Sequence, residues 1–197
     1  MTEEAGSPWL VVGLGNSGPS YAGNRHNVGH LVVAELADRV GGSFRTHKTG
    51  RAEVVEGRIG GVGGPRVVLA RLRGYMNESG GPTKALAQFY KTPAGRVVAV
   101  HDELDIPFDT LRVKLGGGDN GHNGLRSLRS ALGTGEFFRV RVGIGRPPGR
   151  QSPADFVLSD YSSVERKILP FQVDRAAEAV ESLVREGLER TQTAFNS

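Results

Sequence analysis

Three short, almost uninterrupted apolar runs constrain the fold of this chain more than any other feature of its sequence. They are Trp9–Val12, Val67–Leu72 and Val97–Val100. Runs of this length without polar alternation are typical of strands buried on both faces, which occur mainly in parallel sheets. Parallel strands need long crossover connections, and helices usually supply them. The sequence therefore predicts an α/β fold with a largely parallel sheet and helices on both faces.

Helical periodicity is found where these crossovers are expected. Leu31–Val40 places Val33, Leu36 and Ala37 on one face, and Gly41 follows as a stop signal. Three further helices are expected: one with Leu86, Phe89 and Tyr90 on its inner face, one with a stripe of Leu125, Leu128 and Leu132, and one that begins at Ser162.

Segments that alternate polar and apolar residues complete the predicted sheet. Ser43–Ile59 is expected to form a pair of strands near the edge, and Leu111–Leu115 a short strand. Phe137–Ile144 alternates sharply and places Arg139 and Arg141 on one face. The chain length suits one domain, which we expect to span residues 9–190. We expect residues 1–8 to be a disordered extension and 191–197 to be a tail.

Composition excludes several classes of function. The chain has no cysteine, which rules out disulfides, thiolate nucleophiles and cysteine metal sites. The amino end is acidic and lacks the apolar region of a signal peptide, and no run approaches the ~20 apolar residues of a membrane span. A cytoplasmic protein without a membrane partner is expected. The formal net charge of +4 is compatible with a polyanionic partner but is weak support for one.

Polar side chains follow each of the three apolar runs. In open α/β sheets, ligands bind outside the carboxyl ends of the strands. We therefore expect these side chains to meet at one rim: Asn16, Tyr21 and His26 after the first run, Asn77 after the second, Asp102 after the third, and His122 and Asn123 at the start of a helix after a glycine-rich loop.

The residue types at this rim favour hydrolysis by activated water. The chain has no GxSxG nucleophile elbow, which disfavours a serine nucleophile. His26 can take a proton from water, and Asp102 can fix the tautomer of the ring. Asparagine side chains donate and accept hydrogen bonds without charge, so they can position a water or stabilise an oxyanion. Such a set suits cleavage of an activated ester.

The glycine-rich segment after the first run allows two other interpretations. Gly13–Gly18 spells the dinucleotide-binding pattern GxGxxG, but Pro19 prolongs the loop and Asp38, the candidate ribose ligand, falls inside a predicted helix. His26–His30 is close to the zinc-protease pattern HExxH, but Asn27 stands where the glutamate should be. Both interpretations are disfavoured. We interpret the glycines as room for a backbone turn beside a bulky substrate end.

The chain resembles the bacterial peptidyl-tRNA hydrolase family in four segments, which have the family's order and spacing. These are VVGLGNSGPSYAGNRHNVGH, RGYMNESG, HDELDIPFDTLRVKLGGGDNGHNGLRS and FRVRVGIGRP. The resemblance implies cleavage of the ester between a peptide and the 3′ end of tRNA. It also implies a single α/β domain with a twisted mixed sheet, a monomeric protein, and no metal or organic cofactor.

The resemblance also implies a role for each candidate residue. His26 would be the catalytic base, Asp102 its orienting partner, and Asn16 would hold the reacting groups. The substrate would contact Tyr21, Met76, Asn77, His122 and Asn123, with Asn77 and Asn123 on the peptide backbone. Lys114 and Arg141 would clamp the tRNA 5′ phosphate. The chain departs from the family pattern at Asp119-Asn120, a variable position, and at Arg146, where histidine is common.

Two other functions are compatible with parts of this pattern. One is a module that binds tRNA without cleaving it, although a pure binder would not require the histidine, aspartate and asparagines together. The other is a cofactor-dependent enzyme, which the prolonged glycine loop disfavours.

Overall fold

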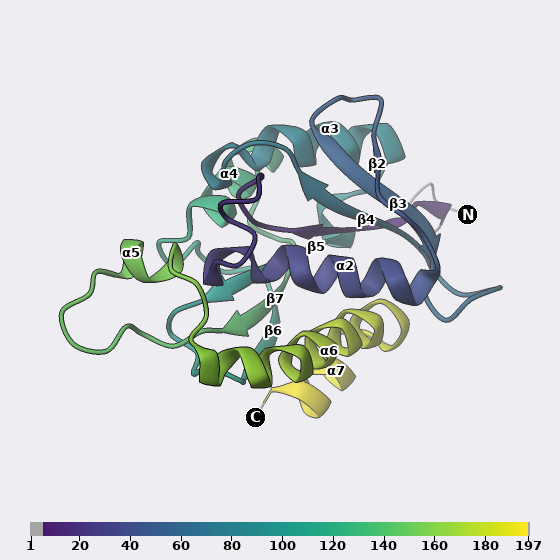
Figure 1. Cartoon of the computed structure of the whole chain (residues 1–197). Coiled ribbons are helices and arrows are strands. Elements are labelled where there is room, and N and C mark those ends of the chain that lie inside the picture. Colours follow the sequence, from purple (N-terminus) through teal and green to yellow (C-terminus); the bar gives the residue numbers. More distant parts are fainter. Residues whose placement is uncertain (1–5, 197) are drawn as a thin grey trace.

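A seven-stranded mixed sheet forms the centre of the computed structural model, which describes residues 6–196 (Figure 1). The strands follow the order β2-β3-β4-β1-β5-β7-β6 across the sheet. Their bounds are β1 Trp9–Gly13, β2 Arg45–Thr46, β3 Ala52–Arg58, β4 Arg66–Leu72, β5 Val97–Glu103, β6 Leu111–Leu115 and β7 Phe138–Gly143.

The central four strands, β4, β1, β5 and β7, pair in parallel, and β2, β3 and β6 add antiparallel pairs at the two edges. The three apolar runs became β1, β4 and β5, which lie side by side. The predicted mixed sheet with a parallel centre is therefore confirmed.

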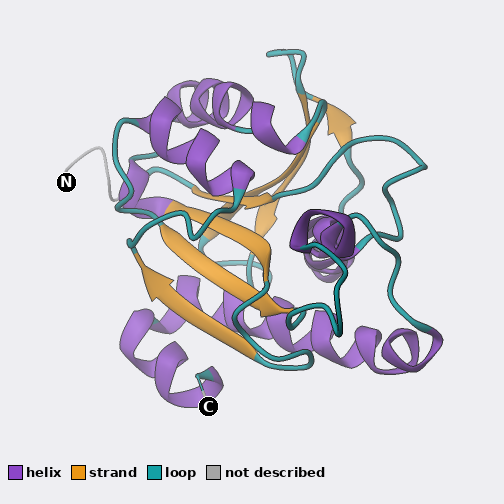
Figure 2. Cartoon of the chain, turned by 90° about the vertical axis from the view of Figure 1, so that its left-hand side faces the viewer, coloured by secondary structure: helices purple, strands orange, loops and turns teal. Residues whose placement is uncertain are grey.

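Helices cover both faces of the sheet (Figure 2). On one face α2 and α6 pack against Val11 of β1, and on the other α3 and α4 pack against Leu10 and Val12. The helices are η1 Arg25–Asn27, α2 Val28–Val40, η2 Met76–Glu78, α3 Gly80–Tyr90, η3 Ala94–Arg96, α4 Asn123–Leu132, α5 Pro153–Val157, α6 Ser163–Glu186 and α7 Leu188–Phe195. No helix within residues 6–196 is long and apolar enough to cross a membrane.

Two glycines bring α2 unusually close to the sheet. A Cβ atom on Gly29 would lie 2.3 Å from the Val100 carbonyl oxygen, and one on Gly13 would lie 2.3 Å from the Gly29 carbonyl oxygen. Gly13 and Gly29 therefore serve helix–strand packing, which corrects our interpretation for Gly13. Gly18, with a φ of 105°, does begin a turn, because its carbonyl accepts from the Tyr21 N–H. The close packing fixes η1, the short helix that immediately precedes α2.

The inner face of α3 differs from the prediction. Leu86 is fully buried, but Phe89 is 45% exposed and packs edge-on against the ring of His47 at 4.5 Å between centroids. The hairpin between β2 and β3 reaches this side of α3, so Phe89 finds an aromatic partner outside the core.

Both ends of the described chain are more structured than expected. The predicted disorder of residues 1–5 lies outside the described residues, but Pro8 is buried and its carbonyl accepts a hydrogen bond from Thr92 Oγ1 at 2.9 Å. At the other end, the boundary expected at residue 190 falls inside α7. Thr191 is buried, and the Asn196 side chain accepts from the Val113 N–H at 2.7 Å and donates to its carbonyl at 3.0 Å. The segment predicted as a tail therefore covers edge strand β6.

Candidate active site

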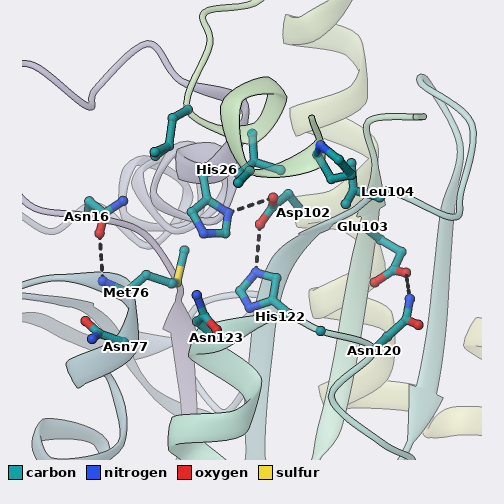
Figure 3. Close-up of a pocket in the computed structure, with 15 residues that line it drawn as sticks. Asn16, His26, Met76, Asn77, Asp102, Glu103, Leu104, Asn120, His122 and Asn123 are labelled. Carbon is teal, nitrogen blue, oxygen red and sulfur yellow. Dashed lines mark hydrogen bonds and ion pairs between the residues drawn. The ribbon is translucent and has the colours of Figure 1, made fainter. Parts of the chain in front are cut away.

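A pocket of about 350 Å³ opens at the carboxyl ends of β1 and β5 (Figure 3). All of the expected site residues line it except Tyr21, Lys114 and Arg141. They come from the loop after β1, from η1 and η2, from the end of β5 and from the start of α4. The rule that ligands bind beyond the carboxyl ends of parallel strands therefore located the pocket correctly.

His26 and Asp102 meet in this pocket although 76 positions separate them in the sequence. Nδ1 of His26, on η1, lies 2.8 Å from Oδ2 of Asp102, near the end of β5. The Asp102 side chain is almost fully buried, and the His26 ring lines the pocket. An ionised carboxylate can only accept hydrogen bonds, so Nδ1 carries the proton and Nε2 has its lone pair free. Within residues 6–196, no hydrogen bond occupies that Nε2 atom.

A second imidazole binds the other oxygen of Asp102. His122 Nε2 lies 2.8 Å from Asp102 Oδ1. The same ring caps α4, because its Nδ1 accepts from the backbone N–H groups of Gly124 at 3.1 Å and Leu125 at 3.3 Å. Since Nδ1 accepts, the proton of the neutral ring is on Nε2 and is donated to Asp102. His122, which we expected only among the substrate contacts, therefore also fixes Asp102.

These contacts keep Asp102 ionised. Burial alone would raise the pKa of its carboxyl, but the adjacent imidazoles of His26 and His122 and the hydrogen bonds from both rings hold it well below its usual range. Ligand-type atoms of the three residues lie within 4.8 Å of one another, a spacing that metal sites also have. The ring nitrogens that face Asp102 both carry protons, so the observed hydrogen bonds account for this cluster. That no metal is used stays a prediction.

His101 lies behind this group and is fully buried. Its Nδ1 donates to the Asp102 carbonyl at 2.8 Å, and its ring packs against the His122 ring at 4.9 Å between centroids. Burial, followed by the neighbouring His122, lowers the pKa of His101 to about 3. A neutral His101 thus supports both the strand end and the His122 ring.

Asn16 is held in one orientation by its neighbours. Its side-chain Oδ1 accepts from the Met76 N–H at 2.7 Å, which directs the amide nitrogen away from Met76 and toward the His26 side of the pocket (Figure 3). Asn27 exchanges two hydrogen bonds with the Asn16 backbone, at 2.9 and 2.8 Å. The Asn16 Nδ2 group is therefore a fixed donor inside the pocket.

The other expected substrate residues occupy two different places. Met76 is buried in the pocket wall, and Asn77 and Asn123 lie at its mouth, where both are exposed. Tyr21 lies outside the pocket lining and packs edge-on against Tyr75 at 6.3 Å between ring centroids. The two tyrosines form an aromatic surface beside the pocket.

The segment around α5 forms an apolar wall that the sequence did not reveal. Its pocket-lining residues are Pro153, Ala154, Val157 and Leu158. Arg25, the residue before His26, ties this wall to η1: its guanidinium lies 4.0 Å from the centre of the Phe156 ring and 2.7 Å from Glu165 Oε1. Arg25 therefore holds the apolar wall close to His26.

Lys114 and Arg141 lie on one face of the β6–β7 pair, beyond Glu103. A Cβ on Gly117 would lie 2.7 Å from Lys114 Nζ, which places the lysine against the glycine-rich loop. Burial and then the positive charges of Arg141 and Arg139 lower the pKa of Lys114, while Glu103 opposes this. The two cations are near each other, and neither lines the pocket.

Two neighbours of this pair were not singled out as site residues. Arg139 is fully buried and donates to the carbonyl groups of Gly117, at 2.8 Å, and of Gly118, which secures the glycine-rich loop. Asn120 donates to Glu103 and, at 2.7 Å, to Asp105, which also binds Arg146 at 2.7 Å. Asn120 and Arg146, two positions at which the chain departs from the family pattern, therefore both bind Asp105 at the rim of the pocket.

Comparison with known proteins agrees with this arrangement. A model of the family described as peptidyl-tRNA hydrolase matches residues 10–197. The chain belongs to this family. It is 61% identical to a peptidyl-tRNA hydrolase of Streptomyces coelicolor over 100% of this chain and 99% of that protein. It is 59% identical to one of an Arthrobacter species over 96% of each chain.

Solved structures of peptidyl-tRNA hydrolases share the fold. The crystal structure of the enzyme from Acinetobacter baumannii superimposes with a TM-score of 0.85, at 32% identity, over 96% of this chain and 95% of that chain. The family resemblance inferred from four sequence segments is therefore confirmed over nearly the whole length.

Proposed function

We propose that this protein hydrolyses the ester bond between the peptide and the tRNA 3′ end of peptidyl-tRNA and releases both. The observation that carries the proposal is the 2.8 Å contact of His26 Nδ1 with the buried Asp102 carboxylate, in a pocket where none of residues 6–196 forms a hydrogen bond with His26 Nε2. A histidine held in this tautomer has the ring-nitrogen lone pair that a general base needs. Family membership supports the choice of substrate.

In the proposed reaction, His26 Nε2 takes a proton from a water molecule as the water oxygen attacks the ester carbonyl. Asp102 stabilises the imidazolium that forms, and the fixed Asn16 Nδ2 donates to the developing oxyanion. When the tetrahedral intermediate collapses, the imidazolium returns its proton to the leaving ribose hydroxyl. The products are a free tRNA and a peptide carboxylate.

We assign the remaining contacts to the two parts of the substrate. Asn77 and Asn123 are free to pair with the peptide backbone, and Met76 and the α5 wall accept apolar groups. Tyr21 offers a ring to the tRNA 3′ end, and Lys114 and Arg141 form the clamp for the tRNA 5′ phosphate. His122 holds Asp102 in position through its hydrogen bond, and the edge of its ring contacts the substrate. We expect a cytoplasmic monomer that needs no metal, so activity should survive EDTA.

Single-turnover cleavage of N-acetyl-aminoacyl-tRNA by the wild-type and His26→Ala proteins tests the proposal. The variant should lose at least about 100-fold in rate, as expected for removal of a general base, while its tRNA affinity persists. If His26→Ala cleaves as fast as wild type, the mechanism is wrong. If the wild-type protein retains tRNA but leaves the ester intact, the protein is an RNA-binding module.

A further inference from the structure

A groove leads from the catalytic pocket along the surface between α3 and α4. Asn77 and Asn123 line both the pocket and a second hollow, whose other lining residues include Arg126 and Ser130. Ser130 in turn also lines a third hollow, between the carboxyl-terminal ends of α3 and α4. The three hollows therefore follow one another along α4, starting from the catalytic pocket.

The close approach of the two helices gives this groove its floor. A Cβ on Gly80 would lie 2.1 Å from the Ser127 carbonyl oxygen, and the Gly80 N–H donates to Ser127 Oγ at 2.8 Å. Three small residues line the hollow beside this contact, namely Ser127, Ser130 and Ala131. Because their side chains are short, they leave a hollow between the helices, which Arg126 also lines.

Hydrogen-bonding groups at the entrance are available to a ligand. Asn77 and Asn123 are exposed, and neither side-chain amide forms a hydrogen bond to another of residues 6–196. A primary amide has both a donor and an acceptor, so it can pair with the N–H and C=O groups of an extended peptide whatever its side chains are. The entrance therefore suits a peptide backbone.

The groove is positively charged along its length. Arg126 stands at its middle with its side chain 63% exposed, and Lys84 and Lys91 line its far end. Among the described residues that line the second and third hollows there is no aspartate or glutamate. Arg126 forms an ion pair at 3.5 Å with Asp119, which lies outside the lining and offsets part of its charge, while Lys84 and Lys91 add two further cations. The charge favours a ligand with acidic groups.

We propose that this groove binds the part of the peptide that extends beyond the catalytic pocket, in an extended conformation and with a preference for acidic side chains. The inference rests on the function proposed above. Nine residue steps from Asn123 to Leu132 correspond to roughly 14 Å of helix, which about four extended residues would cover. An RNA strand could also bind these cations, but the groove opens at Asn77, on the opposite side of the pocket from Glu103 (Figure 3). The Lys114–Arg141 pair is near Glu103, whose charge acts on Lys114.

Substrates that share one tRNA and differ only in the peptide test this proposal. They carry an N-acetyl amino acid, a neutral N-acetyl pentapeptide, or the same pentapeptide with acidic residues at its amino-terminal end. For the wild-type protein, KM should fall by about tenfold from the first to the third substrate. Steady-state kcat and KM are measured separately for each.

Two variants obstruct or neutralise the groove, and each has a matched control on the same helix. Ser130→Trp fills the middle of the groove and should raise the ratio of pentapeptide KM to amino-acid KM by about tenfold. Arg126→Gln should remove most of the preference for the acidic over the neutral pentapeptide. Arg129 does not line the groove, so Arg129→Trp and Arg129→Gln should leave both ratios unchanged.

The outcomes separate this inference from the proposed function. If KM is independent of peptide length in the wild type, or if Ser130→Trp changes it equally for all three substrates, the groove does not bind peptide. The second result would indicate tRNA in the groove, because the tRNA is common to all substrates. In either case cleavage of the N-acetyl-aminoacyl ester leaves the hydrolase function standing. A wild-type protein that cleaves none of the esters would overturn both proposals.

Discussion

Nε2 of His122 lies 2.8 Å from Oδ1 of Asp102, so the carboxylate that orients His26 is itself held by a second histidine. Substitution of His122 should therefore impair the reaction without removing any reacting group. With one oxygen unpaired in a buried site, Asp102 loses part of what keeps it ionised and oriented. We expect His122→Ala to lower kcat by about 10- to 100-fold and, because the ring also contacts the substrate, to raise KM by a smaller factor.

His122→Asn separates the two tasks of this residue. Asparagine is a good helix cap but is too short to reach Asp102 in the same way, so it should restore most of the ~1 kcal/mol of stability that loss of the cap costs. Its kcat should stay low. If His122→Asn recovers both stability and kcat, the contact with Asp102 does not matter for turnover. Urea denaturation and single-turnover cleavage measure the two effects.

Buried neutral histidines should make stability depend on pH. The pKa of His101 is lowered to about 3, and that of His30 to about 4, in both cases first by burial. In the unfolded chain both rings titrate near 6.5, so the unfolded state takes up more protons as the pH falls below that value. The stabilisation is complete above pH 6.5 or so and is lost as the pH falls toward the folded-state values.

Around pH 5, each further fall of one pH unit should lower the free energy of unfolding by up to about 2.7 kcal/mol, with both rings contributing. Asp102 adds to this trend only below about pH 4, where the unfolded carboxyl becomes protonated. Urea midpoints between neutral and mildly acidic pH measure the slope. The slope reports how many more protons the unfolded state binds, and His101→Asn should reduce this number by about one per molecule. An unchanged slope would show that His101 is not held neutral.

Gly29→Ala should strongly destabilise the fold. The added Cβ would lie 2.3 Å from the Val100 carbonyl oxygen and 2.7 Å from the Leu14 nitrogen, and both are backbone atoms of the sheet or its edge. Because α2 must move away, we expect a loss of about 3 kcal/mol or more. Gly95→Ala is the control, since a Cβ there meets nothing within 4 Å, and it should stay within about 0.5 kcal/mol. Equal stability of the two variants would contradict the packing role.

The sequence predicted those features that depend on local patterns. Continuous apolar runs identified β1, β4 and β5. The rule that ligands bind beyond the carboxyl ends of parallel strands correctly predicted that His26 and Asp102 lie close together. The sequence did not predict features that depend on a single distant pair. The α5 wall is placed by contacts such as that of Arg25 with the Phe156 carbonyl oxygen, 131 positions apart, and no periodicity marks such a pair. The helix α7 was missed because it is short and polar and is fixed by contacts such as those of Asn196 with β6.

Arg25 should control how well the α5 wall is ordered. Arg25→Met keeps apolar contact with Phe156 but removes the ion pair with Glu165 and the hydrogen bonds to the carbonyl groups of Phe156 and Ser159. We expect KM to rise about fivefold and kcat to change less, with a loss of roughly 2 kcal/mol in stability. Limited proteolysis of the exposed loop at 148–151 should become faster. Arg166→Met, an exposed arginine on α6, is the control and should change none of these quantities.

Lys114→Ala tests the proposed phosphate clamp through its salt dependence. Each lysine–phosphate contact releases about one counterion, so the plot of log affinity against log salt for tRNA should lose about one unit of slope. Cleavage of a model ester that lacks the tRNA body should not change. Lys167→Ala makes the same charge change on α6, which covers the opposite face of the sheet, and should leave the slope unaltered. If Lys114→Ala and Lys167→Ala weaken tRNA binding equally, the effect is one of overall charge, and Lys114 does not contact a phosphate.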